Sequence, residues 1–181
     1  LSSSNYGKII NEKHFNRISG LIDKNKVVFG GQTDSETLQI SPTVMDHVTY
    51  EDKVMQEEIF GPIMPILTYD SLDELIHKIN SMPHPLALYF FTRDKVAARK
   101  VTSQCQFGGG CINDTIIHLA TSEMPFGGFG ESGMGGYHGH EGFRTFSHYK
   151  SIVDKKTWLD LPMRYQPYKR INDKLIHFFL K

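Results

Sequence analysis

The sequence predicts an α/β fold built around a mainly parallel sheet. Three observations support this prediction. Apolar runs of strand length alternate with segments of helical periodicity, residues that cap helices precede those segments, and one run is apolar at every position. The order strand, helix, strand, helix, strand between residues 63 and 113 is typical of right-handed crossovers, which join parallel strands.

The first predicted helix begins after Asn11, a residue type that caps helix N-termini. A strand follows at Val27–Phe29 and is ended by Gly30 and Gly31. The helix would place its apolar positions on one face: Phe15, Ile18, Leu21 and Ile22.

Prolines shape the next predicted strands. Residues 38–40 and 43–45 are extended pieces on either side of Pro42, which cannot donate a ladder hydrogen bond inside a sheet. The apolar run 63–67 is a further strand, and Pro65 within it indicates an edge or a bulge.

A second helix is predicted from the capping-box spacing of Ser71 and Glu74. Residues 86–91 form a continuous apolar run, as expected of a strand buried on both faces. Asp94 caps a third helix, and residues 110–113 complete the strand pattern. The inward positions of the second helix would be Leu72, Leu75, Ile76 and Ile79.

The remaining chain is dominated by a glycine-rich segment, residues 125–142, which holds eight of the 16 glycines. Long loops of this kind are usually functional. Residues 128–133 match the dinucleotide fingerprint G-x-G-x-x-G, but no strand precedes them and more glycines follow, so we reject a phosphate loop here. Residues 147–153 are predicted to form a late strand, and the chain from Trp158 onward an irregular tail.

The composition is that of an ordinary globular protein, with 39% hydrophobic and 22% charged residues. Lys and Arg number 20 and so do Asp and Glu, so the chain lacks the basic excess of a nucleic-acid-binding protein. Two cysteines are too few for a disulfide framework and favour a reducing, cytoplasmic location. Because the chain begins with Leu1 rather than Met, we expect a piece of a longer protein.

The most informative stretch is Glu57–Pro62, two carboxylates and a ring that run into a Gly-Pro breaker before an apolar strand. A carboxylate held on such a turn can accept hydrogen bonds from two neighbouring hydroxyls, and a ring beside it can cover a flat heterocycle. Taken alone, the hexapeptide favours the simpler interpretation of an acidic loop with one core phenylalanine.

Several later motifs stand in a recognisable order. The chain carries Asn113-Asp114, 124–128 (MPFGG), 132–135 (SGMG) and 137–139 (YHG), then 143–148 (FRTFSH) and 161–168 (LPMRYQPY). This order resembles the C-terminal part of aldehyde dehydrogenases, and the last two motifs resemble the class-three branch, which includes fatty-aldehyde enzymes. The resemblance implies that residues 1–146 are the C-terminal part of a catalytic domain and that 147–181 form an oligomerisation strand and tail.

The resemblance also implies a cofactor and site residues. Glu58 would hold the ribose hydroxyls next to the nicotinamide of NAD or NADP, and Phe60 would pack beside the nicotinamide. The substrate would be an aldehyde, and the implied pocket residues are Ile116, Ala120, Phe126 and His138. Ala120 is smaller than the residues often found at its position.

The family's nucleophile, general base and oxyanion asparagine have no counterpart in this sequence. Cys105 and Cys111 do not stand in the Gly-Gln-x-Cys context of the nucleophile, so we interpret both as structural. His138 and His140 lie two apart without a nearby Cys or carboxylate cluster, so we expect no metal site. We therefore expect the isolated chain to be inactive.

Two hypotheses remain open. The chain is either the C-terminal segment of an NAD(P)-dependent aldehyde dehydrogenase, or a truncated relative that self-associates without catalysis; a related semialdehyde or acyl-phosphate reductase is a third, weaker alternative. We expect a homodimer paired through residues 147–153. The apolar cluster in residues 169–181 is shorter than the roughly 20 residues that span a bilayer, so we expect a soluble protein, with interfacial attachment as the alternative.

Overall fold

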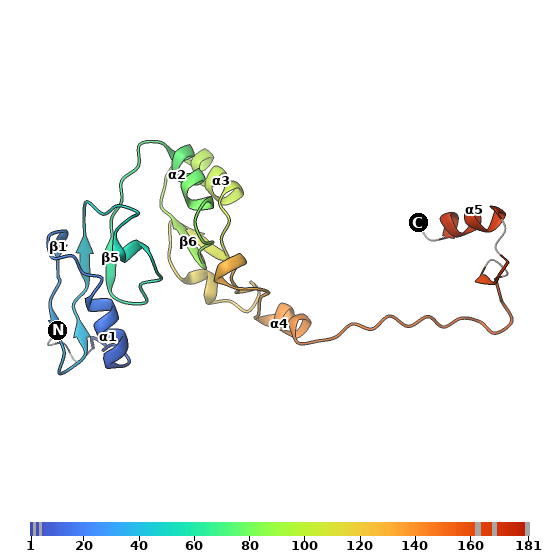
Figure 1. Cartoon of the computed structure of the whole chain (residues 1–181), viewed down its shortest axis with the longest axis horizontal. Helices are drawn as coiled ribbons and strands as arrows, with labels where there is room; N and C mark the ends of the chain where they lie inside the picture. The colour runs from blue at the N-terminus through green and yellow to red at the C-terminus, as the bar shows by residue number, and fades with distance from the viewer. Residues whose placement is uncertain (2, 4, 162–163, 168–169, 180–181) are drawn as a thin grey trace. The chain divides into compact units, whose positions relative to one another are not determined.

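The structure is a computed structural model, and it describes residues 1, 3, 5–161, 164–167 and 170–179. The described chain forms two compact units (Figure 1). The first comprises residues 1–84 and 92–106, and the second comprises residues 85–91 and 107–181. Some residues of the predicted tail lie outside the described part: Pro162, Met163, Tyr168, Lys169, Leu180 and Lys181.

The first unit contains two small sheets. One has the order β1 (Val27–Phe29), β4 (Thr43–Met45), β5 (Ile63–Pro65), in which β1 and β4 are antiparallel and β4 and β5 are parallel. The other pairs β2 (Thr33–Asp34) with β3 (Gln39–Ile40) in antiparallel fashion. Because β5 is an edge strand, its proline removes no ladder hydrogen bond from the sheet interior, as predicted.

Helix α1 (Glu12–Ser19) begins where the sequence predicts. The Asn11 side chain accepts a hydrogen bond from the His14 amide at 2.9 Å, which satisfies one of the free amides of the first turn. Phe15 and Ile18 are buried on the helix face that meets the strands. The core of the first unit consists of Phe15, Ile18, Leu21, Ile40, Met45, Val48, Val54 and Ile63.

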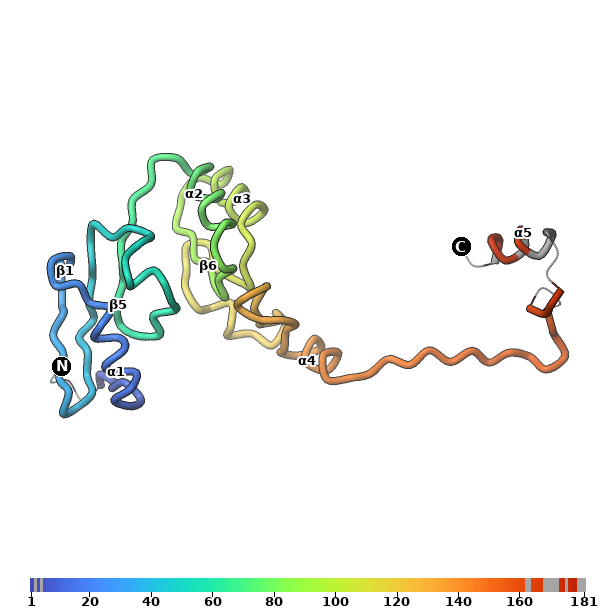
Figure 2. The backbone as a smooth tube through the Cα atoms, viewed as in Figure 1, coloured from blue at the N-terminus to red at the C-terminus, as the bar shows by residue number. Residues whose placement is uncertain are grey.

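Helices α2 (Leu72–Asn80) and α3 (Lys95–Gln104) lie side by side in the first unit (Figure 2). Asn80 Nδ2 donates to the carbonyl oxygen of Gln104 at 2.7 Å, and Lys100 forms an ion pair with Asp73. The predicted caps are confirmed, since Ser71 accepts from the Glu74 amide and Asp94 from the Val96 amide. Of the predicted inward positions of α2, only Ile76 is fully buried.

The second unit contains the parallel pair β6 (Ala87–Phe90) and β7 (Gly109–Ile112). Their register places Leu88 opposite Gly110 and Phe90 opposite Ile112. The strand is where the sequence predicts it, but the prediction that both of its faces are buried is wrong for this chain. All four residues of β6 are half-buried, because a two-stranded sheet cannot cover both faces.

The prediction of one mainly parallel sheet is met only in part. Three separate sheets are present in the described residues, and two of their four strand pairings are parallel. The class is mixed α/β. Its two parallel pairs are β6 with β7, which were predicted to be joined by a crossover, and β4 with β5.

The glycine-rich segment is a loop with three short helices in and around it. Phe126 and Tyr137 form an isolated antiparallel bridge across it, with both N–H···O bonds at 2.9 Å. The 3₁₀ turn η2 (Ile117–Leu119) precedes the segment, the 3₁₀ turn η3 (Gly130–Ser132) lies within it, and helix α4 (Gly139–Thr145) begins in it and extends beyond its end. A further 3₁₀ turn, η1 (Lys53–Met55), belongs to the first unit.

The C-terminal region departs from the sequence-based expectation in two places. The predicted strand 147–153 is wrong for the single chain: residues 147–156 have no regular structure, because no strand of the described chain pairs with them. Residues 170–179, expected to be irregular, form helix α5 (Arg170–Phe179). Within the described residues, no helix combines the length and apolar character needed to cross a bilayer.

Candidate functional site

The turn that carries Glu58 and Phe60 leads from η1 into strand β5. Its end is fixed to the sheet, because the Thr43 amide donates to the carbonyl oxygen of Pro62 at 2.8 Å. Phe60 has a φ of 47°, in the left-handed region that non-glycine residues seldom adopt. Such a conformation persists only where the surroundings hold it, and it occurs frequently at ligand sites.

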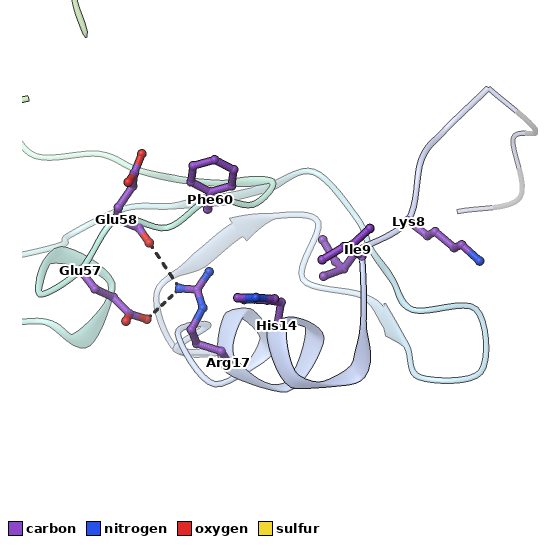
Figure 3. A pocket seen from close by; sticks show the side chains of 8 residues that line it. Lys8, Ile9, His14, Arg17, Glu57, Glu58 and Phe60 are labelled. Atoms are coloured by element: carbon purple, nitrogen blue, oxygen red, sulfur yellow. Dashed lines mark hydrogen bonds and ion pairs between the residues drawn. The ribbon is translucent and has the colours of Figure 1, made fainter. Parts of the chain in front are cut away.

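Arg17 of α1 reaches the same turn. Its Nη1 donates to Glu57 Oε1 at 2.8 Å and to the Glu58 carbonyl oxygen at 3.3 Å, and its Nη2 donates to the Ile59 carbonyl oxygen at 2.8 Å. Figure 3 shows the Glu58 carboxylate pointing away from Arg17, whereas the Glu58 carbonyl oxygen faces it. The two carboxylates therefore differ in environment, because Glu57 forms an ion pair with Arg17 whereas the Glu58 carboxylate points away from it.

Beside this turn lies a cavity of about 720 Å³, within the usual size range of small-molecule sites. Among the described residues, no hydrogen bond or ion pair of the Glu58 carboxylate is present, and the Phe60 ring is 81% exposed. The cavity is lined by Lys8, Ile9, Ile10, His14, Arg17, Glu57, Glu58 and Phe60 (Figure 3).

This arrangement suits a polar ligand that also has a flat face. A carboxylate without a protein partner can accept hydrogen bonds from two adjacent hydroxyls through its two oxygens. An exposed aromatic ring two residues later offers a flat apolar surface. The structure thus places the two sequence-predicted cofactor residues, Glu58 and Phe60, on one turn and at one cavity.

The predicted substrate-pocket residues belong to the second unit, where two of them flank η2. Ile116 precedes this turn, and its carbonyl oxygen accepts a hydrogen bond from the Leu119 amide at 2.8 Å. Ala120 follows the turn, and its amide donates to the Ile117 carbonyl oxygen at 3.0 Å. Ile116 has a φ of 65°, which is a clear outlier for a β-branched residue, and its side chain is 62% exposed.

The other two predicted pocket residues, Phe126 and His138, lie close together. Their ring centroids are 6.2 Å apart with an interplanar angle of 27°. Tyr137 packs on both, edge-on, with centroid distances of 5.7 Å to Phe126 and 4.6 Å to His138. The strand-like bridge between residues 126 and 137 brings these rings together across the glycine-rich loop.

His118, which the sequence analysis did not single out, is buried beside this cluster and contacts its Phe126 ring. It is 5% exposed, its ring lies 6.3 Å from Phe126 and 5.7 Å from Tyr89, and its Nδ1 is 3.5 Å from the Cys111 sulfur. The only signal in the sequence is a single histidine inside an apolar run, Ile116 to Leu119. Such a residue more often packs than reacts.

The two cysteines are free thiols. Cys105 is 7% exposed, and burial raises the pKa of its thiol. Cys111 lies in β7 and is half-buried. Neither arrangement supplies an exposed, activated nucleophile.

The glycine-rich fingerprint at residues 128–133 contains the single turn η3 and no strand–helix unit, in line with its rejection as a phosphate loop. A β-carbon at Gly128 would lie 2.2 Å from the Ser132 carbonyl oxygen, so this glycine is needed for a close backbone approach. In the part of the chain that the structure describes, three or more His, Cys, Asp or Glu side chains nowhere converge as metal ligands do.

Sequence comparison places the chain among known proteins. The sequence profile of the aldehyde dehydrogenase family matches residues 2–152. The chain is 50% identical over 169 residues to a 4,4'-diaponeurosporen-aldehyde dehydrogenase of Staphylococcus aureus, an alignment that covers 92% of the chain and 37% of that relative. It is 42% identical over 174 residues to aldehyde dehydrogenase family 3 member H1 of Arabidopsis thaliana, covering 94% of the chain and 36% of the relative.

A rat enzyme named "aldehyde dehydrogenase, dimeric NADP-preferring" is 47% identical over 153 residues, covering 84% of the chain and 34% of that enzyme. The chain thus spans well under half the length of these curated relatives.

Solved structures agree. A substrate-bound Staphylococcus aureus AldH superposes with a TM-score of 0.86 at 49% identity, over 99% of this chain and 40% of that one. A P. syringae indole-3-acetaldehyde dehydrogenase in complex with NAD+ superposes with a TM-score of 0.73 at 27% identity, over 82% of this chain and 31% of that one. Since the family profile matches most of its length and the relatives include members of family 3, the chain belongs to the aldehyde dehydrogenase family.

Proposed function

We propose that this chain supplies the nicotinamide-ribose clamp and part of the substrate-pocket wall of an enzyme that oxidises aldehydes to carboxylic acids with NAD or NADP. The observation that carries the proposal is the turn at the 720 Å³ cavity, where an exposed Phe60 lies two residues after Glu58, whose carboxylate is unpaired among the described residues. NAD+ is also the ligand named for the P. syringae relative, and NADP is preferred by the rat relative according to its name.

The residues present fit such a cofactor. Glu58 would accept hydrogen bonds from the two ribose hydroxyls, and Phe60 would limit the positions open to the nicotinamide. When bound, the cofactor accepts the hydride of the aldehyde. Orientation of this kind matters because a displacement of about 1 Å can lower the rate of a reaction by roughly 100-fold.

The covalent steps require a nucleophile and a general base, and neither has a counterpart in this sequence. In the proposed reaction a cysteine thiolate outside these motifs would add to the aldehyde carbonyl, loss of hydride to the cofactor would turn this adduct into a thioester, and a glutamate would activate the water that cleaves the thioester. Within this chain, Phe126 and His138 would form one wall of the aldehyde pocket and Ile116 and Ala120 another. The proposed division assigns residues 1–146 to the catalytic domain and 147–181 to oligomerisation and tail.

A hybrid enzyme tests the proposal. In the Staphylococcus aureus relative, the region matched by this chain would be replaced with this chain, and Glu58→Gln would then be introduced. Gln fills the same space but loses the charge-assisted hydrogen-bond acceptors, which changes the binding free energy of the ribose by about 1–3 kcal/mol. Hydride transfer from the substrate to the cofactor should therefore slow about 5- to 150-fold. Pre-steady-state kinetics with a C1-deuterated aldehyde measures this step.

The matched control is Glu36→Gln, which removes the charge of an exposed side chain within the β2–β3 turn. It should leave the kinetics unchanged. If Glu58→Gln changes neither the isotope-sensitive rate nor the affinity for NAD(P), Glu58 is not the ribose clamp and the proposed function of this turn fails.

A further inference from the structure

We propose that Arg17 is a positioning residue of this site, which holds the turn at residues 57–60 in the shape that presents Glu58 and Phe60. This inference rests on the proposed function for its consequence, but its geometric part stands on contacts within the first unit alone. Arg17 comes from α1, about 40 residues away in sequence, so the two segments are held together in space by this side chain.

The guanidinium group of Arg17 binds three oxygens of the turn through two of its nitrogens, so the contact is more than a simple ion pair. One guanidinium nitrogen donates to Glu57 Oε1 at 2.8 Å and to the Glu58 carbonyl oxygen at 3.3 Å, and the other donates to the Ile59 carbonyl oxygen at 2.8 Å. Two consecutive carbonyl groups that point at one planar cation fix the orientation of both peptide planes. The side chains of the turn then have to leave in other directions.

Figure 3 shows this consequence directly. The carbonyl oxygen of Glu58 faces Arg17, while its carboxylate points away. Arg17 therefore binds the backbone of Glu58 without neutralising its charge, and the carboxylate is left for another donor. The Glu57 carboxylate serves as the counter-charge of the guanidinium instead.

The ion pair by itself would contribute little. The side chains of Arg17 and Glu57 are 27% and 44% exposed, and solvent-exposed pairs of this kind are weak. The two carbonyl contacts are the ones that matter for shape. They fall immediately before Phe60, whose φ of 47° is unfavourable for a side-chain-bearing residue and has to be held by its surroundings.

The first test uses the 181-residue chain and needs no cofactor. Cleavage by a glutamate-specific endoprotease after Glu57 or Glu58, read by mass spectrometry, should be at least about tenfold faster in Arg17→Gln, because cleavage requires the turn to open locally. The control is Arg99→Gln, which removes an exposed arginine of the first unit whose Nε donates to the Lys95 carbonyl oxygen of its own helix. Unchanged cleavage after Glu57 and Glu58 in Arg17→Gln overturns the proposal.

The second test separates positioning from a merely structural role. In the hybrid enzyme, Arg17→Gln should lower kcat about 10- to 100-fold and raise the deuterium isotope effect, while the KM for the aldehyde stays the same. Guanidinium ion added to Arg17→Ala should restore part of the rate. Arg17→Lys keeps the charge but not the planar pair of donors, so its kcat should stay below that of wild type.

The outcomes are distinguishable from failure of the proposed function. If Arg17→Gln speeds cleavage at the turn but leaves kcat and the isotope effect unchanged, the positioning role is overturned. A different result would separate the two proposals: Glu58→Gln leaves the kinetics unchanged, whereas Arg17→Gln lowers kcat and guanidinium restores the rate of Arg17→Ala. The role of Glu58 as ribose clamp would then be wrong, and Arg17 would act by positioning Phe60.

Discussion

Gly61 lies directly against the side chain of Ile18, so that a β-carbon at position 61 would be 2.9 Å from both Cδ1 and Cγ2 of that residue. Ile18 is 1% exposed and belongs to the core of the first unit. The turn at residues 57–62 therefore meets α1 twice, through an apolar contact at Gly61 and through the polar contacts of Arg17.

Gly61→Ala should destabilise the chain by about 1–3 kcal/mol, because the buried Ile18 has little room to move and the added methyl overpacks the contact. Urea denaturation followed by circular dichroism measures the change. Gly7→Ala is the control, since nothing lies within 4 Å of a β-carbon there. Equal urea midpoints for the two variants would show that the turn moves freely away from α1.

Stability should depend on pH through Asp52. Lys26 lies 2.5 Å from its carboxylate, and this hydrogen bond, with a second from the Thr49 amide, lowers the pKa of Asp52 below its ordinary value. A carboxyl group whose folded pKa is lowered stabilises the fold above its unfolded pKa of about 3.9, and this contribution is lost as the pH falls through the folded value. The free energy of unfolding of wild type should thus exceed that of Asp52→Asn at about pH 6, and the difference should shrink as the pH is lowered below about 3.9. A difference that is constant over this range would contradict the assignment.

The two thiols should react at different rates in the folded chain. Cys105 is buried and its thiol pKa is raised, so its thiolate is scarce and shielded, whereas Cys111 is only half-buried. Timed iodoacetamide labelling at about pH 8, read by peptide mass spectrometry, should modify Cys111 at least about tenfold faster. In urea both cysteines should label alike. Faster labelling of Cys105 in the native chain would refute the packing described for α3.

The isolated chain should oxidise no aldehyde, because neither cysteine has the setting of the family's nucleophile and the sequence shows no counterpart of its base. NAD(P)H formation with aliphatic and aromatic aldehydes measures this. Turnover above background that disappears on substitution of Cys105 or Cys111 would prove the expectation wrong.

Self-association should depend on residues 147–153. Their backbone groups have no ladder partner in the described chain, and Tyr149, Ile152 and Val153 are 70%, 75% and 88% exposed. A second copy related by a two-fold axis could cover them without leaving an open edge. We expect a dimer by light scattering and a shift toward monomer in Ile152→Lys, with Lys24→Gln, an exposed lysine of the first unit, as a surface control. A wild-type monomer would rule out this pairing.

The features predicted from the sequence are those decided by neighbouring residues. Asn11, Ser71 and Asp94 each cap a helix by accepting from an amide two or three residues later, so a short window of sequence contains the cause. Glu58 and Phe60 were placed together for the same reason, because they share one turn.

The features that were missed depend on distant partners. Nothing near Arg17 in the sequence signals its contacts with residues 57–59. A strand at 147–153 needs a neighbour that the single chain does not provide, and the prolines at 162 and 167 obscured the helical spacing of α5. How strands group into sheets is likewise decided by tertiary contacts rather than by the apolar runs themselves.

Phe60, Ile116 and His138 have φ angles of 47°, 65° and 93°, a region in which glycine is the residue that the backbone favours. At these three positions, selection for a robust fold and selection for the roles proposed for the side chains act in opposite directions. A library screened only for resistance to heat would drift toward glycine there and lose those side chains. Thermostabilised variants of this chain should therefore be chosen with residues 60, 116 and 138 held constant.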